Sequence, residues 1–306
     1  MGFMRIGVLD IGSNTGHLLI VDAFRGGPPV PAHSYSEPLR LAENLSYDGA
    51  MTEEGIDRLV KYVGEARSQA EDKGAERVIA FATSAVRDSP DAASVLRLVR
   101  DQTGMELRVL PGEDEARLTF LAVRRWFGWS AGRIGMFDIG GGSLELAVGA
   151  DESPDVAVSL PLGVGRLTRE RFDRGESFAD VRRDVRREIG AVAGPLLRSG
   201  GFDRAVATSK TFRSLARMCG AAPRADGPYV RRELRSDDLQ QLVGQLRVST
   251  NDQIAGLPGV SATRAHQMLA GALVAEATMD LFGLERLEVC PWALREGVLI
   301  EYLDHL

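Results

Sequence analysis

The sequence predicts an α/β protein built from two similar domains. The main observation is a repeat: Arg5–Gly12 reads RIGVLDIG, and Arg133–Gly140 reads RIGMFDIG. Each copy continues through a turn into a second apolar run, so each half opens with strand, turn, strand. Strand-sized apolar runs then alternate with longer amphipathic segments, and 306 residues suffice for two hydrophobic cores.

The C-terminal copy, Phe137–Gly149, reads FDIGGGSLELAVG and carries the clearest chemistry. Its turn consists of Gly140, Gly141, Gly142 and Ser143. Glycine permits positive φ and leaves backbone N–H groups uncovered, and converging N–H groups bind small oxyanions such as phosphate. Asp138 and Glu145 flank the turn and are oxygen ligands of the kind that Mg²⁺ takes when it bridges phosphates. This pattern indicates a phosphate site with a metal edge, the alternative being a plain glycine-rich hairpin.

The N-terminal copy places Asp10 in register with Asp138. Its turn reads Gly12, Ser13, Asn14 and Thr15 in place of the glycines. If the turns of two similar domains face each other, they would grip a phosphate chain from both sides.

The next elements of the N-terminal half are a helix from Thr52 to about Lys73 and a buried strand over Arg77–Ala82. Thr83–Arg87 follows at the carboxyl end of that strand, where open α/β sheets tend to bind ligands. Arg87 is therefore a candidate to hold a phosphate oxygen, and the alternative is a solvated loop arginine.

A helix ending near Thr103 and a strand over Leu107–Leu110 come next. The helix that follows them begins with three acids. They are Glu113, Asp114 and Glu115. Acids in a first helical turn are stabilised by the helix dipole. Alternatively, one of them is a general base that takes a proton from an attacking water. The residues alone do not choose among the three.

The segment 127–132 separates the halves and predicts domains over 1–128 and 129–306, with the last helix able to pack back on the first domain.

After the second hairpin come a strand over Val156–Leu160 and an arginine-rich helix over 179–197. The acids of that helix lie three and four residues from its arginines, which favours self-pairing. Lys210 lies in a loop between a strand over Arg204–Ala207 and a helix over Phe212–Met218. Helices over Ser236–Leu246 and Ala262–Phe282, a strand over Leu287–Val289 and a terminal helix complete the chain.

Composition excludes several classes of function. The net charge of −6 argues against general nucleic-acid binding. The apolar runs are too short for a transmembrane helix, no export signal is recognisable, and two cysteines suggest no disulfide framework, so we expect a cytoplasmic protein. The sequence contains no P-loop motif, no Gly-x-Ser-x-Gly motif and no clustered histidines, so hydrolysis would use water, carboxylate and metal.

Four motifs in this order resemble the exopolyphosphatase / guanosine pentaphosphate phosphohydrolase family (Ppx/GppA). They are DIGSNT, TSAVR, GEDEARLTF and DIGGGSLEL. The resemblance implies two ribonuclease-H-like domains of the acetate kinase/Hsp70/actin-like superfold around a cleft. It implies Mg²⁺-dependent release of a terminal phosphate, with Mn²⁺ as a second candidate metal, from polyphosphate or from guanosine pentaphosphate. It also favours a homodimer.

The resemblance assigns the acid before Ala-Arg, Glu115, as general base. It implies that Asp138 and Glu145 place metal and water in catalysis, with Asp10 as a further metal ligand. The glycine turn and Ser143 would then cradle the phosphate, with Arg87 and the first turn, Asp10, Gly12, Ser13 and Asn14, opposite. Lys210 departs from the family, in which small residues stand at this position, and is expected to add a phosphate contact peculiar to the short forms. In many relatives a threonine stands at Leu144, so a cradle hydroxyl is expected to be missing here. The rival interpretations are an ATP-using kinase or ATPase of the same superfold and a non-catalytic sensor of guanosine polyphosphates.

Overall fold

The computed structural model describes residues 4–24, 26–27, 29–198 and 200–306 and divides into two compact units. Unit 1 comprises Met1–Glu115 with Arg295–Leu306, and unit 2 comprises Ala116–Leu294. The division falls inside one helix, α4 (Gly112–Phe127), whereas the sequence places the domain boundary after Gly128. That boundary stays a prediction. The terminal residues 295–306 group with unit 1.

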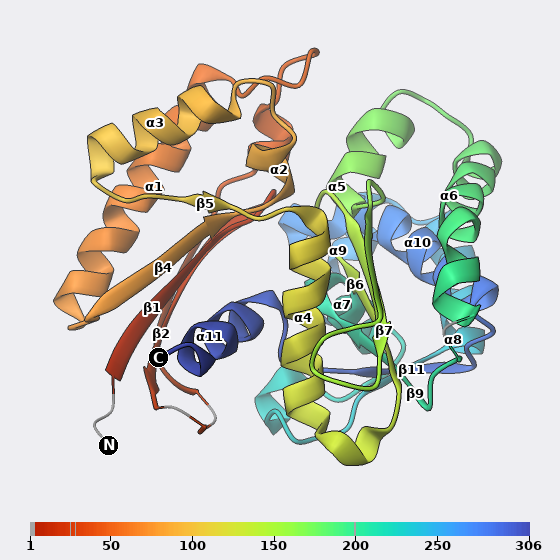
Figure 1. The fold of residues 1–306 in the computed structure, drawn as a ribbon. Coiled ribbons are helices and arrows are strands. Elements are labelled where there is room, and N and C mark those ends of the chain that lie inside the picture. Colours follow the sequence, from red (N-terminus) through yellow and green to blue (C-terminus); the bar gives the residue numbers. More distant parts are fainter. Residues whose placement is uncertain (1–3, 25, 28, 199) are drawn as a thin grey trace. The chain divides into compact units, whose positions relative to one another are not determined.

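Unit 1 contains a five-stranded sheet in the order β3-β2-β1-β4-β5 (Figure 1). The first three strands form an antiparallel meander, and β4 and β5 continue the sheet parallel to β1. The strands are β1 (Met4–Ile11), β2 (Thr15–Ala23), β3 (Val30–Pro38), β4 (Arg77–Ala82) and β5 (Arg108–Val109).

Helices cover both faces of this sheet. They are η1 (Leu41–Asn44), α1 (Glu53–Asp72), α2 (Ser84–Arg87), α3 (Ala92–Thr103) and α11 (Leu294–Asp304). Leu9 and Ile11 of β1 share an apolar cluster with Leu59 and Val63 of α1. Because side chains alternate along a strand, Asp10 points to the opposite face. That face is covered by α11, since Tyr302 of α11 stacks on Arg77 of β4 at 5.1 Å.

Unit 2 contains a six-stranded sheet in the order β10-β11-β9-β6-β7-β8. Its strands are β6 (Ile134–Ile139), β7 (Leu144–Gly149), β8 (Val156–Leu160), β9 (Arg204–Thr208), β10 (Glu233–Arg235) and β11 (Arg286–Val289). Strands β6, β7 and β8 form an antiparallel meander, and β9 and β11 continue it in parallel. Unit 2 therefore repeats the topology of unit 1 and adds β10. This repeat, together with the two sheets, confirms the predicted α/β fold class.

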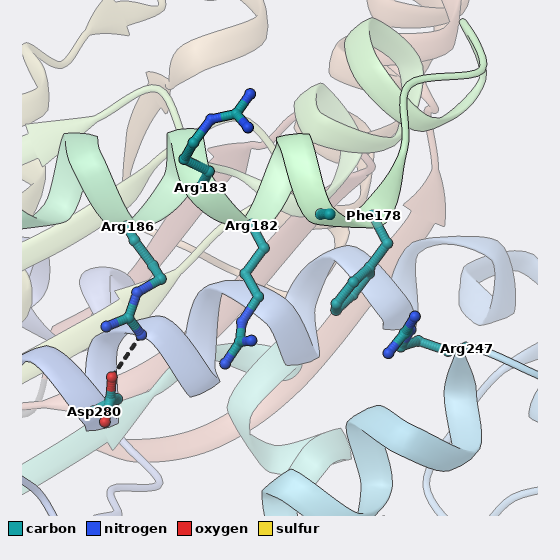
Figure 2. Close-up of a pocket in the computed structure, with 7 residues that line it drawn as sticks. Phe178, Arg182, Arg183, Arg186, Arg247 and Asp280 are labelled. Atoms are coloured by element: carbon teal, nitrogen blue, oxygen red, sulfur yellow. Dashed lines mark hydrogen bonds and ion pairs between the residues drawn. The ribbon is translucent and has the colours of Figure 1, made fainter.

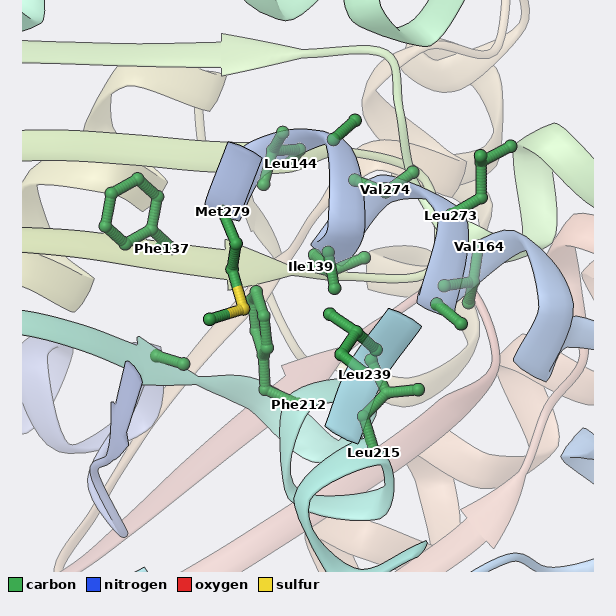
Figure 3. Close-up of a cluster of buried hydrophobic side chains, with 14 of the residues drawn as sticks. Phe137, Ile139, Leu144, Val164, Phe212, Leu215, Leu239, Leu273, Val274 and Met279 are labelled. Atoms are coloured by element: carbon green, nitrogen blue, oxygen red, sulfur yellow. The ribbon is translucent and has the colours of Figure 1, made fainter. Parts of the chain in front are cut away.

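The helices of unit 2 enclose its main core on one face of the sheet (Figure 3). They are α5 (Val164–Leu167), η3 (Thr168–Phe172), α6 (Phe178–Arg198), α7 (Ser209–Met218), α8 (Ser236–Leu246), α9 (Asn251–Ala255), η5 (Ala262–Gln267) and α10 (Met268–Leu281). Two further short elements lie outside this core: η2 (Trp129–Ala131), whose Ala131 packs on the opposite face, and η4 (Arg224–Asp226). Phe137 and Ile139 of β6 pack in this core with Phe212 of α7 and Met279 of α10.

The other face of the unit 2 sheet is covered by α4. Phe120 and Val123 of α4 form a second cluster with Ile134 and Met136 of β6. The two clusters together fix the register of β6, because neighbouring side chains on a strand point to opposite faces.

Three local expectations are wrong. The helix expected from Phe212 begins at Ser209, so Lys210 lies in the first turn of α7 and not in a loop. The single helix expected over 262–282 is a 3₁₀ segment, η5, followed by α10. Strand β10 and helix α9 were not expected, because segments of three and five residues carry too little periodicity to be recognised.

Arg124 of α4 donates hydrogen bonds to backbone carbonyls of the loops at one end of unit 2. It is 1% exposed, and its guanidinium donates to the carbonyls of Gly132 at 2.7 Å and Gly149 at 3.1 Å. It also reaches the carbonyls of Gly128 and Asp151, each at 3.3 Å. Burial lowers the pKa of the Arg124 guanidinium. The carbonyl oxygens thus compensate much of the cost of burying this charge.

We expect Arg124→Met to lower the free energy of unfolding by about 2–4 kcal/mol, since it removes hydrogen bonds to four carbonyls in a buried site. The matched control is Arg125→Met, which breaks the half-exposed ion pair with Glu152 and should cost less than about 1 kcal/mol. Urea unfolding of both variants measures the difference. Equal losses would show that the carbonyl contacts contribute little.

Candidate active site

Asp138 and Glu145 lie directly opposite each other across the β6–β7 pair. Directly opposed residues of an antiparallel pair project side by side from one face, here the face covered by α4. Both are buried, at 9% and 4% exposure, and Glu145 Oε1 accepts a hydrogen bond from Ser159 Oγ at 2.8 Å. Two opposed carboxylates repel each other. A cation held near both would relieve that repulsion.

The glycine turn beside these acids directs N–H groups away from α5. Val164 N–H donates to the carbonyl of Gly140 at 3.0 Å, and Gly165 N–H donates to that of Gly141 at 2.8 Å. In a trans peptide the C=O and the following N–H point in opposite directions. The N–H groups of Gly141 and Gly142 therefore point away from α5. A Cβ at Gly140 would lie 3.9 Å from Glu145 Oε2, so the carboxylate lies close to the turn.

The glycines are needed here for spacing. The positive-φ residues of the described chain do not include Gly140, Gly141 or Gly142, so the expectation of positive φ is wrong. Instead, the backbone at Gly163 packs against the turn: a Cβ there would lie 2.2 Å from the carbonyl carbon of Gly142. The loop over 161–165, which contains Gly163 and Gly165, thus supports the glycine turn.

We expect Gly163→Ala to displace the glycine turn, because the added methyl would meet backbone atoms that cannot rotate away. The free energy of unfolding should fall by about 2 kcal/mol or more. The control is Gly190→Ala on the exposed side of α6, where a Cβ meets nothing within 4 Å. That change should raise stability by about 0.5–1 kcal/mol. Thermal unfolding distinguishes them, and an unchanged Gly163→Ala protein would contradict the packing argument.

The equivalent turn in unit 1 is joined to α2. Gly12 N–H donates to the carbonyl of Thr15 at 3.1 Å, and the hydroxyls of Ser13 and Ser84 lie 2.8 Å apart. Both serines are buried. The carbonyl of Asn14 accepts from the backbone N–H of Arg40 at 3.0 Å. Ser84 was not expected as a partner of the turn, because only the parallel pairing of β1 with β4 brings it there.

Arg87 and Glu115 are brought together in unit 1. The Arg87 guanidinium pairs with the Glu115 carboxylate, with Asp88 at 2.9 Å and with the carbonyl of Leu110 at 3.2 Å. Among the three acids of the first turn of α4, Glu115 is buried whereas Glu113 is exposed and Asp114 half-buried. This difference favours Glu115 as the acid with a chemical role.

Asp10 pairs with Arg295 of α11, whose Nη1 lies 3.5 Å from Asp10 Oδ2. Burial raises the pKa of the Asp10 carboxyl to about 6, while Arg295 acts to lower this pKa and Glu296 to raise it. Arg295 was missed in the sequence, although it lies in the conspicuous segment CPWALREG. Nothing local signals that the far end of the chain returns to β1.

The raised pKa gives a pH dependence with a definite sign. The folded-state pKa of about 6 exceeds the ordinary value of 3.8, so between these values the folded chain holds a proton that the unfolded chain lacks. Stability from this group therefore falls as pH rises from about 4 to about 6. Relative to wild type, Asp10→Asn should become more stable by about 1–3 kcal/mol between pH 4 and pH 7. Urea unfolding in metal-free buffer measures this, and a pH-independent difference would contradict it.

Leu144 does not line the turn, contrary to expectation. Its side chain is fully buried in the main core of unit 2 beside Ile139 and Val274. A hydroxyl at this position would face the core, so its absence removes nothing from the turn.

An arginine-rich groove lies elsewhere on unit 2, between α6, α8 and α10 (Figure 2). It has a volume of about 650 Å³ and is lined by Phe178, Ala179, Arg182, Arg183, Arg186, Arg247 and Asp280. Arg183 pairs with Asp180 on its own helix, as predicted, whereas Arg182 reaches Glu276 and Arg186 reaches Asp280 on α10. Its charges are largely neutralised internally, so the groove is a weaker candidate than the glycine turn.

No group of three or more His, Cys, Asp or Glu side chains suited to a metal occurs in the described part of the chain. Asp138 and Glu145 still fit Mg²⁺, which commonly uses one or two carboxylates and completes its shell with water and substrate phosphates. Asp10 has Arg295 as its neighbouring cation and stays a prediction as a ligand.

The chain matches the family model described as "Ppx/GppA phosphatase family" over residues 20–306. It belongs to that family. Exopolyphosphatase 1 of Mycobacterium tuberculosis is 53% identical over 305 residues, which cover 98% of this chain and 89% of the relative. The crystal structure of an exopolyphosphatase from Cytophaga hutchinsonii has a TM-score of 0.85 and 26% identity, with 99% of each chain covered.

A more distant relative carries the other activity in the family name. Guanosine-5'-triphosphate,3'-diphosphate pyrophosphatase of Photobacterium profundum is 26% identical over 302 residues, covering 97% of this chain and 59% of the relative. The Ppx/GppA match and the two repeated sheets confirm the predicted family and its actin-like, two-domain α/β fold. No helix in the described ranges is long and apolar enough to cross a bilayer.

Proposed function

We propose that this chain is an exopolyphosphatase that releases terminal orthophosphate from inorganic polyphosphate by metal-assisted attack of water. The observation that carries the proposal is the buried, register-paired Asp138 and Glu145 beside the N–H groups of Gly141 and Gly142. The high identity to a relative named exopolyphosphatase 1 supports polyphosphate as the substrate.

The residues of unit 2 bind the phosphate that is removed. The N–H groups of the glycine turn and the Ser143 hydroxyl would donate hydrogen bonds to its oxygens. Asp138 and Glu145 would hold Mg²⁺ or Mn²⁺, with Asp10 as a further proposed ligand. When bound, the metal supplies positive charge that stabilises the phosphoryl oxygens in the transition state.

Arg87 and Glu115 exchange partners during this reaction. In the described structure Glu115 is ion-paired with Arg87. A substrate phosphate bound by Arg87 would replace Glu115 as its partner, because arginine pairs well with phosphate oxygens. The freed Glu115 carboxylate then orients the attacking water and takes its proton. The base thus becomes available when a phosphate is present.

Three alternatives to this function are testable. Guanosine pentaphosphate is the main alternative substrate, given the name of the Photobacterium relative. An ATP-using kinase or ATPase of the same superfold is a weaker alternative. A non-catalytic sensor of guanosine polyphosphates is also weaker, because a sensor has no use for a general base such as Glu115. We further propose that the protein acts in the cytoplasm. We also propose that it forms a homodimer, as the family resemblance favours.

The test is a phosphate-release assay with tripolyphosphate, long-chain polyphosphate, guanosine pentaphosphate and ATP, each with Mg²⁺ and with a chelator. We expect polyphosphate to be the best substrate and the chelator to abolish release. In Glu115→Gln, kcat should fall by about 10²–10⁴-fold, the usual contribution of a positioned general base.

The matched control is Glu113→Gln, an exposed acid of the same helical turn, which should keep nearly normal kcat. Near-normal turnover in Glu115→Gln would remove Glu115 from the role of base. Faster release from guanosine pentaphosphate or ATP than from polyphosphate would replace the proposed substrate.

A further inference from the structure

The two acids of the candidate active site belong to a polar row that crosses four strands of unit 2. Its members in spatial order are Thr208 of β9, Asp138 of β6, Glu145 of β7 and Ser159 of β8, each in register with the next. Residues in register on neighbouring strands project from the same face of a sheet, so the four side chains share one face. Each acid therefore has a hydroxyl residue as its outer neighbour.

The two hydroxyls of this row are used differently. Ser159 Oγ donates to Glu145 Oε1 at 2.8 Å, whereas Thr208 Oγ1 donates to the backbone carbonyl of Trp292 at 2.8 Å. A hydroxyl has a single hydrogen to donate, so Thr208 cannot also donate to Asp138. The row therefore orients Glu145 through Ser159 and leaves the orientation of Asp138 to other contacts.

The contact with Ser159 determines where each oxygen of Glu145 lies. Oε1 is bound to Ser159 on β8, the edge strand of the sheet, while Oε2 would lie 3.9 Å from a Cβ at Gly140. The terminal torsion of a glutamate is broad, so a carboxylate without a fixed partner turns readily. Hydrogen bonds from a hydroxyl to a carboxylate are short and comparatively strong. Ser159 thus holds the carboxylate with one oxygen directed toward the glycine turn.

The repeat in unit 1 has the same arrangement with one acid replaced. Asp10 is in register with His17 of β2, as Asp138 is with Glu145. The hydroxyl oxygen of Ser34, on the third strand of that meander, lies 3.2 Å from His17 Nε2. In both units a serine of the third strand therefore contacts the residue that opposes the aspartate. Because unit 1 has a histidine at this position, a serine contact of this kind acts on a pair of acids in unit 2 and not in unit 1.

We propose that Ser159 is a positioning residue for the metal that Asp138 and Glu145 would hold. Its hydroxyl leaves Oε2 of Glu145 as the oxygen offered to the metal and prevents the carboxylate from turning to bind through both oxygens. This inference rests on the proposed function for the identity of the two ligands.

The orientation of Glu145 bears on which metal the site prefers. Mg²⁺ requires a nearly ideal octahedral shell, and the two oxygens of one carboxylate lie too close together to fill two octahedral positions. Ca²⁺ accepts irregular shells and carboxylates that bind through both oxygens. By holding Oε1, Ser159 would favour Mg²⁺ over Ca²⁺.

Metal binding tests this role without requiring turnover. Electron paramagnetic resonance of free Mn²⁺ gives the Kd of Mn²⁺, and displacement of bound Mn²⁺ gives the Kd values of Mg²⁺ and Ca²⁺. Ser159→Ala should weaken Mn²⁺ and Mg²⁺ binding by about 10–100-fold, the usual effect of losing a hydrogen bond to a metal ligand. Ca²⁺ binding should weaken much less, because Ca²⁺ tolerates a carboxylate that turns. Ser159→Thr keeps the hydroxyl and should restore the wild-type values.

Two further variants control this measurement. Ser177→Ala removes a serine hydroxyl that donates to a carboxylate elsewhere, Asp180 of α6 at 2.7 Å, and should leave all three Kd values unchanged. Asp138→Asn removes a proposed ligand and should abolish the Mn²⁺ binding that Ser159→Ala weakens. Ser159 is half-buried on an edge strand, so its alanine variant is expected to fold, and thermal unfolding checks this for every variant.

The possible results separate the role of Ser159 from the proposed function. An unchanged Kd of Mg²⁺ in Ser159→Ala would overturn the positioning role, and so would equal losses for Mg²⁺ and Ca²⁺, which indicate general damage to the site. Wild-type protein that binds no Mn²⁺, or binding that persists in Asp138→Asn, would overturn it too, because the acids would then not be a metal site. If wild-type protein releases no phosphate from polyphosphate, the proposed function fails, while the Kd values still decide the role of Ser159.

Phosphate release provides a second readout for Ser159. In Ser159→Ala, the Mg²⁺ concentration that gives half-maximal release should rise by about 10–100-fold, in parallel with Kd. The kcat at saturating Mg²⁺ should stay near the wild-type value, since the hydroxyl acts on metal binding and not on the attacking water. A lower kcat at saturating Mg²⁺ with an unchanged half-maximal concentration would contradict the positioning role.

Discussion

The arrangement of the site depends on the two-residue period of strand β6. Phe137 and Ile139 face the main core of unit 2, so Asp138 must face α4, where Met136 also packs. A shift of one residue would bury Asp138 among Phe212 and Met279 and turn two large apolar residues to the other side. The same alternation on β7 sends Glu145 to the face of Asp138 while Leu144 and Leu146 enter the core. Apolar packing thereby holds two carboxylates side by side in spite of their mutual repulsion.

Much of this arrangement could be predicted from the sequence, because the decisive signals are local. The repeat around Asp10 and Asp138, the glycine turn and the returning strand all lie within short segments. Strand β4 and helix α8 begin and end at the expected residues for the same reason. Strand β4 is a short, continuous apolar run, and the apolar residues of α8 recur with the period of a helix.

Features that depend on contacts between distant segments could not be predicted from local sequence patterns. Arg295 meets Asp10 from the other end of the chain, and Arg264 meets Thr211 from a segment with no recognisable motif. The start of α7 was misplaced because Thr-Ser-Lys-Thr resembles a loop, and only the structure reveals the turn at Ser209 that admits the helix early. Leu144 was misjudged because a motif gives the order of side chains but not the face each one takes.

The contact between Gly163 and Gly142 has a consequence for how this site can change over time. Each loop excludes side chains from the other, although 21 positions separate the two glycines in the sequence (163 minus 142). A mutation that enlarges either position is therefore tolerable only after the other loop has moved, so the two segments are expected to evolve in concert. For the same reason, a designer who transplants the glycine hairpin into a new scaffold must carry residues 161–165 along with it.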